Sequence, residues 1–243
     1  MPDVSYRVLT ACSLSCEFCS LWQQAPHQQD YLPLSDVLCD LKALAGAKVC
    51  LHLGGGDPLL YPQLADLLQQ AQPWFKALWL YTPGMRYPAM AERIRPWVDE
   101  LCLVLNHPLE ADNDRIGGEH HFELVRASVR KAQAIGQSLR LLLLTHCESA
   151  LFLPEAEELA RALGVRLELR PTHVYLQNAR LTSETLAYIK RYTRVPGIIV
   201  WPRELRSKKD SVTSKQCAAL PGAKRSAFDH GLQHVRQSFP GWL

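Results

Sequence analysis

Apolar runs of strand length recur six times along the first 170 residues, and amphipathic segments of helical period follow them. The runs cover residues 4–10, 48–53, 77–81, 100–105, 139–145 and 165–170, and the helical segments cover 35–45, 62–71, 88–94, 122–135 and 154–163. Such alternation predicts a parallel sheet with helices as crossovers. Ser35 is predicted to cap the first helix and Gly46 to end it. The last run alternates apolar and polar residues, which indicates an edge strand with one polar face.

The alternation of strand-like and helical segments ends near residue 175, so we expect one large domain with an appendage in this 243-residue chain. Residues 1–175 would form the core, and residues 176–243 a C-terminal extension that packs on it. Within the extension, the pattern predicts one helix over 183–192, a short strand over 198–201 and a charged loop over 203–210.

Composition excludes some classes of protein and leaves the partner open. Apolar residues make up 47% of the chain and charged residues 21%, which excludes wholesale disorder and a fibrous repeat. No apolar run approaches the ~20 residues of a membrane helix, and the N-terminus lacks a signal peptide. We therefore expect a cytoplasmic protein without a membrane partner. The net charge of +3 does not argue for nucleic acid. The basic residues of the tail are interpreted mainly as a solvated surface, with an acidic or nucleic-acid substrate as the alternative.

Cysteine placement carries most of the chemical information. Three of the eight cysteines, Cys12, Cys16 and Cys19, lie within eight residues directly after the first strand. They could be buried thiols, a zinc site or an iron–sulfur site. Structural zinc needs four ligands, usually as two separated pairs, and no second pair exists. Three thiolates on one loop suit a 4Fe-4S cluster whose fourth iron is open to another ligand.

The spacing resembles the CxxxCxφC signature of the radical S-adenosylmethionine (radical SAM) enzymes, with Phe18 as the aromatic residue φ. The resemblance implies that Cys12, Cys16 and Cys19 bind the cluster. It also implies that the amino and carboxylate groups of SAM bind the open iron, and that Phe18 lies against the adenine.

A second segment, residues 53–60, reads Leu-Gly-Gly-Gly-Asp-Pro-Leu-Leu and is similar to the GGEP segment of that family. The resemblance implies that Gly55, Gly56 and Asp57 line the methionine part of SAM. Glycines let the backbone approach a ligand closely, and a carboxylate can pair with its ammonium. Asp57 departs from the pattern, since glutamate is usual there.

A third likeness covers Asn106-His107-Pro108 and the Asp114 to Phe122 segment, and it is shared with molybdopterin-precursor synthases and peptide-modifying members. Together the three likenesses span about residues 4–171. In parallel barrels, working groups gather at the carboxyl ends of the strands. Asn106 and Thr145 are therefore candidates for hydrogen bonds to SAM, and Arg170 for a carboxylate; the alternatives are strand-end caps or surface ion pairs.

These expectations combine into an α/β fold, an incomplete (βα)6 TIM-like barrel of the radical SAM type. The implied activity is reductive cleavage of SAM to a 5'-deoxyadenosyl radical, which abstracts hydrogen from a small-molecule or peptide substrate. The alternatives are glycyl-radical activation of a partner protein and a non-catalytic iron–sulfur or zinc module. A reducing partner such as flavodoxin or ferredoxin is expected. Because only Cys217 follows the sixth strand, no auxiliary cluster is expected.

Two smaller predictions concern side chains outside these motifs. Glu119-His120-His121 is interpreted as a solvated helix start, not a metal site, because adjacent residues do not share a face. Cys39, Cys50 and Cys102 fall at apolar periodic positions and are predicted to be core thiols.

Overall fold

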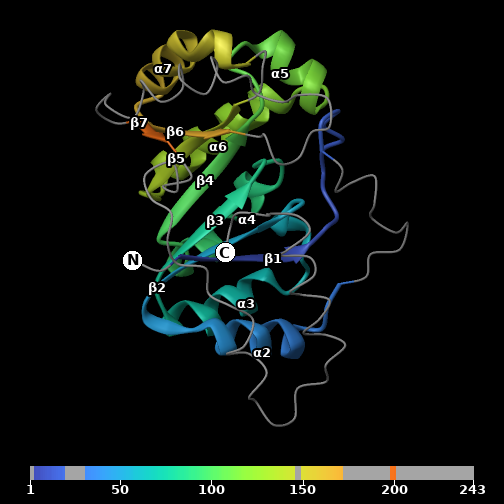
Figure 1. Cartoon of the computed structure of the whole chain (residues 1–243), viewed down its shortest axis with the longest axis vertical. Helices are drawn as coiled ribbons and strands as arrows, with labels where there is room; N and C mark the ends of the chain where they lie inside the picture. The colour runs from blue at the N-terminus through green and yellow to red at the C-terminus, as the bar shows by residue number, and fades with distance from the viewer. Residues whose placement is uncertain (1–2, 20–30, 146–148, 172–197, 201–243) are drawn as a thin grey trace.

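A seven-stranded parallel sheet organises the computed structural model, which describes residues 3–19, 31–145, 149–171 and 198–200 (Figure 1). The strands lie side by side in chain order, and every neighbouring pair is parallel. They are β1 (Asp3–Leu9), β2 (Gly46–Gly55), β3 (Phe75–Thr82), β4 (Glu100–Leu105), β5 (Leu139–Thr145), β6 (Arg166–Pro171) and β7 (Ile198–Val200). The six strands predicted for the core are confirmed, as is the short strand predicted over 198–201, which is β7. The sheet is the partial barrel expected of the radical SAM type.

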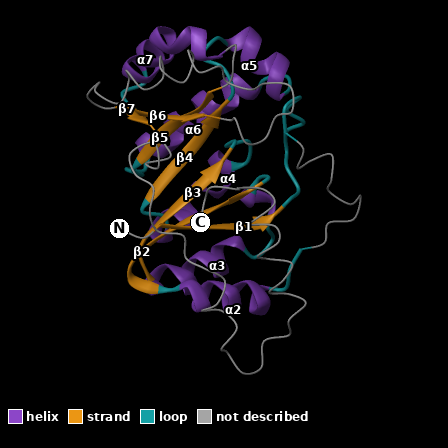
Figure 2. Cartoon of the chain, in the orientation of Figure 1, coloured by secondary structure: helices purple, strands orange, loops and turns teal. Residues whose placement is uncertain are grey.

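Helices connect the strands, as Figure 2 shows. They are α2 (Leu34–Leu44), α3 (Leu64–Ala71), α4 (Tyr87–Ile94), α5 (Glu110–Gly117), α6 (His121–Ala134) and α7 (Leu153–Ala162). The five predicted helices are present, with bounds shifted by one or two residues. Helix α5 was not predicted, and the helix expected over 183–192 lies outside the described residues.

Both ends of α2 differ from the prediction. The residue before the helix is Pro33, and Ser35 lies inside the first turn, where its hydroxyl donates to Asp36 Oδ1 at 3.1 Å. At the other end, the helix closes at Leu44, and Gly46 is already the first residue of β2. Ser35 was therefore wrongly assigned as the cap, because the helix begins one residue before it, at Leu34. Gly46 does follow the end of the helix, directly after the C-cap Ala45, and β2 begins there, earlier than its apolar run.

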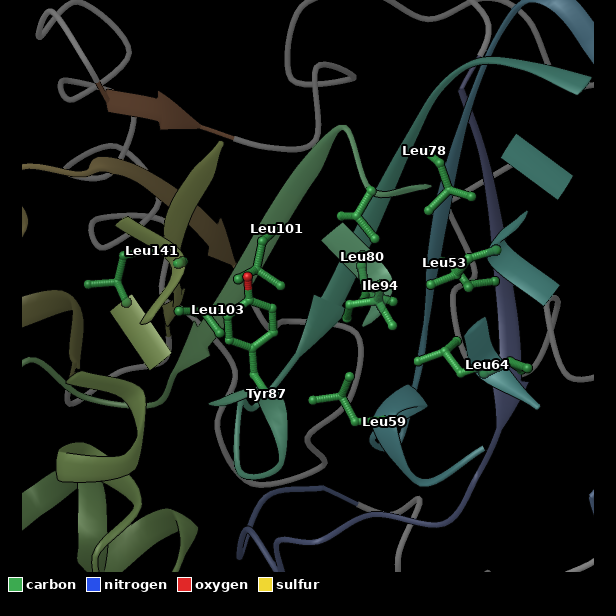
Figure 3. Packing of buried hydrophobic residues seen from close by; sticks show 14 of the residues in the cluster. Leu53, Leu59, Leu64, Leu78, Leu80, Tyr87, Ile94, Leu101, Leu103 and Leu141 are labelled. Atoms are coloured by element: carbon green, nitrogen blue, oxygen red, sulfur yellow. The ribbon is translucent and has the colours of Figure 1, made fainter. Parts of the chain in front are cut away.

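The hydrophobic core lies between the sheet and the helices. Alternate leucines of neighbouring strands point into it, among them Leu53, Leu80 and Leu101, and they pack with helix residues such as Leu64 and Ile94 (Figure 3). All five are fully buried. This alternation, with a period of two, leaves the opposite face of each strand for a different set of side chains.

That opposite face, called the inner face below, carries a chain of buried ion pairs across β4, β5 and β6. Arg140 lies 3.0 Å from Glu100 and 3.1 Å from Glu168, and Glu168 also pairs with Arg170 at 2.5 Å. Arg166 pairs with Glu100 at 2.6 Å. Buried charges persist only when they are paired. The polar alternation of β6 therefore reflects this network.

The prediction that β6 is an edge strand is wrong. Strand β7 pairs with it, from Leu167 opposite Ile198 to Leu169 opposite Val200. Sequence alternation signals a polar face, and here Glu168 and Arg170 find ionic partners on the inner face instead of water.

Candidate functional site

The three clustered cysteines lie on the loop that leaves β1, called the cysteine loop below (residues 10–19). Cys16 is buried and Cys12 and Cys19 are half-buried, while Ser13, Ser15 and Glu17 are exposed. Two sulfurs have N–H donors: Leu14 N donates to Cys12 Sγ at 3.4 Å, and Asn106 Nδ2 donates to Cys16 Sγ at 3.3 Å. Phe18 is half-buried and packs with Cys12 and Cys19 against Leu14, Cys16 and Ile116.

Burial controls the protonation of these thiols. It raises the pKa of Cys12 and of Cys16 to about 12, and the N–H donors oppose part of that rise. As free thiols both are therefore protonated near neutral pH, and binding iron would displace their protons. Once the sulfurs carry charge, the same N–H groups stabilise it.

Helix α5 supports the cysteine loop from the side, and Figure 1 shows the two segments lying together. Glu17 N donates to the Ile116 carbonyl at 3.3 Å, and Arg115 pairs with Glu17 at 2.9 Å. Ile116 is buried against Leu14 and Cys16. The unpredicted helix therefore fixes the outer half of the loop.

The Asp114 to Phe122 pattern has a structural explanation at this point. Asp114 accepts from His120 N at 3.0 Å and from Phe122 N at 2.7 Å, so it satisfies free N–H groups at the start of α6. Gly117 leaves room for the Asn106 amide, since a Cβ there would lie 2.6 Å from Asn106 Nδ2. The pattern thus joins α5 to α6 and seats Asn106 against Cys16.

A buried polar chain holds Asn106 from behind. Asn113 Oδ1 accepts from Asn106 N at 3.0 Å, and Asn113 Nδ2 lies 3.1 Å from His121 Nδ1. Burial lowers the pKa of His121 to about 4, so the ring is neutral. His121 was predicted to be solvated, and that prediction is wrong for this residue. Asn113 was not predicted, because a single asparagine in a polar stretch carries no recognisable signal.

The glycine-rich segment at the end of β2 lies directly on the base of the cysteine loop. Gly55 has φ 138°, and a Cβ on it would lie 2.3 Å from the Leu9 carbonyl oxygen. A Cβ on Gly56 would lie 2.0 Å from the Ala11 carbonyl oxygen. These two glycines therefore let the backbone at the end of β2 pack closely against the residues just before Cys12. Asp57 is also brought to this loop, and its side chain is fully buried.

The remaining candidates lie at other strand ends. Thr145 is fully buried at the end of β5, opposite Pro171. Arg170 lies on the inner face, paired with Glu168 and 4.6 Å above the ring of Tyr81. Its charge is therefore part of the inner-face network. An ion pair is the alternative role predicted for Arg170 from the sequence, and the structure has such a pair inside the barrel and not at the surface.

The chemistry of the cysteine loop fits a 4Fe-4S cluster, for which its three cysteines would supply the thiolates. The buried sulfurs with N–H donors match the surroundings expected of cluster ligands.

The other cysteines give a mixed result. Cys50 and Cys102 are buried, as predicted, whereas Cys39 is exposed on α2 and was wrongly predicted. None of the described cysteines forms a disulfide.

Comparison with known proteins agrees with this geometry. The family model of the radical SAM superfamily matches residues 6–149. Since that match covers more than half of the chain, the protein belongs to the radical SAM superfamily. The cofactors typical of this superfamily are a 4Fe-4S cluster and SAM.

Individual relatives are more distant. The chain is 29% identical over 169 residues to a PqqA peptide cyclase from Gluconobacter oxydans, which covers 68% of the chain and 47% of that protein. It is similar in fold to Streptococcus suis SuiB bound to S-adenosylmethionine, with a TM-score of 0.65, 16% identity, and coverage of 94% and 55% of the two chains. It is also similar to anSMEcpe with bound AdoMet, with a TM-score of 0.60, 12% identity, and coverage of 78% and 59%. The chain spans about half the length of these relatives.

No helix in the described part of the chain is both long enough and apolar enough to cross a bilayer.

Proposed function

We propose that this enzyme uses the radical derived from SAM to modify a peptide. The observation that carries the proposal is the 29% identity to a protein named as a peptide cyclase. Two proteins of similar fold support it, since their structures contain peptides: SuiB is bound to the precursor peptide SuiA, and anSMEcpe to a Cp18Cys peptide. A peptide therefore ranks above a small molecule as the substrate class.

Within this proposal, Cys12, Cys16 and Cys19 hold the cluster. When bound, the cluster and SAM supply a 5'-deoxyadenosyl radical that abstracts a hydrogen atom. The protein contributes position and exclusion of water. Backbone groups of Gly55 and Gly56, together with Phe18, border the SAM site in the proposal.

Asn106 and Thr145 lie on the same rim in this proposal. Asn106 faces Cys16, so its amide lies beside the proposed cluster ligand. Thr145 ends β5 on the edge where the cysteine loop leaves β1, since carboxyl ends of parallel strands share one edge. Arg170 stays the candidate for a carboxylate, because the inner-face network sets three arginines against two glutamates.

The test begins with anaerobic reconstitution, reduction by dithionite and chromatography for 5'-deoxyadenosine. Peptides encoded beside the gene are then added with SAM, and their masses are measured. The proposal expects a SAM-dependent mass change in one peptide and none with the Cys16→Ala variant. A glycyl-radical EPR doublet on a partner protein, or turnover of a small molecule with no peptide changed, would contradict it. Flavodoxin or ferredoxin can replace dithionite to test the expected reducing partner.

A further inference from the structure

The glycine-rich segment and the cysteine loop are joined along their backbones. After the regular β1–β2 pairing ends, Gly56 N donates to the Leu9 carbonyl at 3.0 Å, and Asp57 N donates to the Ala11 carbonyl at 2.8 Å. A side chain on Gly56 would collide with this backbone. The residues up to Cys12 therefore lie on the glycine-rich segment as an irregular extension of the sheet.

The Asp57 side chain continues this connection past the first cysteine. Its Oδ2 accepts from the Ser13 hydroxyl at 2.7 Å. Its Oδ1 accepts from the Thr82 hydroxyl at 2.8 Å and from Leu59 N at 3.1 Å. Ser13 adjoins Cys12, and Thr82 is the last residue of β3. One carboxylate therefore links the cysteine loop to the end of a core strand.

The Asp57 carboxylate is buried, so it depends on these hydrogen bonds. Asp57 is 0% exposed, and a buried carboxylate is tolerated only when donors satisfy it. Three donors supply its hydrogen bonds, and two come from groups that are themselves fixed by the sheet and by the 3-10 helix Pro58–Leu60. Ser13 is the exposed partner, so it is the one that the other contacts hold in place.

We propose that Asp57 is a positioning residue that holds the cysteine loop through Ser13, and that it does not contact the SAM ammonium directly. The proposal rests on the proposed function, since it takes the cysteine loop to be the cluster site. It changes the role expected from the GGEP likeness. A direct SAM contact predicts effects only when SAM is present, whereas a loop anchor predicts effects in its absence.

The experiment measures the cysteine loop without SAM. The variants are Ser13→Ala and Asp57→Asn, with Ser13→Thr as the conservative variant that keeps the hydroxyl and Ser15→Ala as a control on the same loop. The first readout is the rate at which a chelator removes iron from the reconstituted protein. The second is the alkylation rate of Cys12 by iodoacetamide in the metal-free protein, measured by mass spectrometry against the exposed Cys39.

Ser13→Ala and Asp57→Asn are expected to raise both rates by about five- to thirtyfold, the factor that corresponds to roughly 1–2 kcal/mol. Ser13→Thr and Ser15→Ala should stay near wild type. The double variant should be no faster than Asp57→Asn alone, because both substitutions remove the same bond.

Unchanged rates in Ser13→Ala would overturn the proposal, and this variant decides the question even if Asp57→Asn does not fold. Wild-type rates in Asp57→Asn together with a weakened SAM affinity would restore the direct contact. If the wild-type protein takes up no cluster, the proposed function fails, but the alkylation rates of the metal-free protein still test the link between Asp57 and Ser13.

Discussion

The side-chain amide of Asn106 donates to the sulfur of Cys16 across 3.3 Å, although 90 residues separate the two in sequence. Hydrogen bonds to cluster sulfurs favour the reduced, more negative state and so raise the reduction potential. Asn106→Leu should therefore lower the potential, by roughly 20–60 mV for one electron if the bond contributes about 0.5–1.5 kcal/mol. An EPR-monitored redox titration without SAM measures this shift.

Ser15→Ala, on the same loop, is the control for that titration and should leave the potential unchanged. If Asn106→Leu also leaves it unchanged, the amide does not act on the cluster.

The space that Gly117 leaves for Asn106 gives a second prediction. A Cβ there would lie 2.6 Å from Asn106 Nδ2 and 2.8 Å from His121 Nδ1, so Gly117→Ala should displace the amide. We expect a lower potential, as in Asn106→Leu, and a loss of about 1–3 kcal/mol of stability. Denaturant unfolding and the same titration check both effects.

Gly118→Ala is the control, because it introduces backbone strain without a side-chain collision. Gly118 has φ 116° but no atom within 4 Å of an added Cβ. Its substitution should lower stability, because alanine is strained at this positive φ, and should leave the reduction potential of the cluster unchanged. Equal potential shifts in both variants would contradict the role assigned to Gly117.

Burial of His121 predicts a pH dependence of stability. Burial lowers its pKa to about 4 from an ordinary value near 6.5, so the unfolded chain binds the proton first as pH falls. Stability should therefore decline between pH 6.5 and 4, by about 3 kcal/mol from this residue. His121→Gln should show a shallower decline over that window in chemical unfolding. Parallel curves for the two proteins would mean that His121 is not buried in its neutral form.

The sequence predicted the sheet well because its signals are local. Strands β4 and β5 have the predicted bounds, since each is an apolar run between clear breakers. Helix α5 was missed because Glu110–Gly117 has one large apolar residue, Ile116, and hence no helical period. That helix forms because Ile116 and Asn113 are buried against the cysteine loop and Asn106, which are distant contacts.

The same division applies to the site. The spacing of Cys12, Cys16 and Cys19 can be recognised in a single segment. The contact between Ser13 and Asp57 joins residues 44 apart, and it depends on how β1 and β2 align and on the bulge near Leu9. Sequence reasoning placed Asp57 near the cofactors but had no means to find its partners.

The inner-face ion pairs predict a measurable cost when their central charge is removed. Arg140 is buried between Glu100 and Glu168, and Arg140→Met removes both of its bonds. Arg166 and Arg170 still pair with the two carboxylates. We expect a loss of about 1.5–3 kcal/mol in denaturant unfolding, from the lost charge-assisted hydrogen bonds. Arg161→Ala, which removes a solvent-exposed pair with Glu157, is the control and should change stability little. A similarly small effect for Arg140→Met would contradict the paired network.

The most direct test of the account is iron and sulfide analysis with EPR after anaerobic reconstitution of the wild type and of Cys12→Ala, Cys16→Ala and Cys19→Ala. The wild type should hold about four irons and four sulfides per chain and show one reduced 4Fe-4S signal. Each of the three variants should lose that signal, whereas Cys39→Ala, at an exposed position on α2, should keep it. A cluster signal retained in any one of the three variants, or a reproducible iron content near eight per chain, would contradict the assignment of a single cluster to this loop.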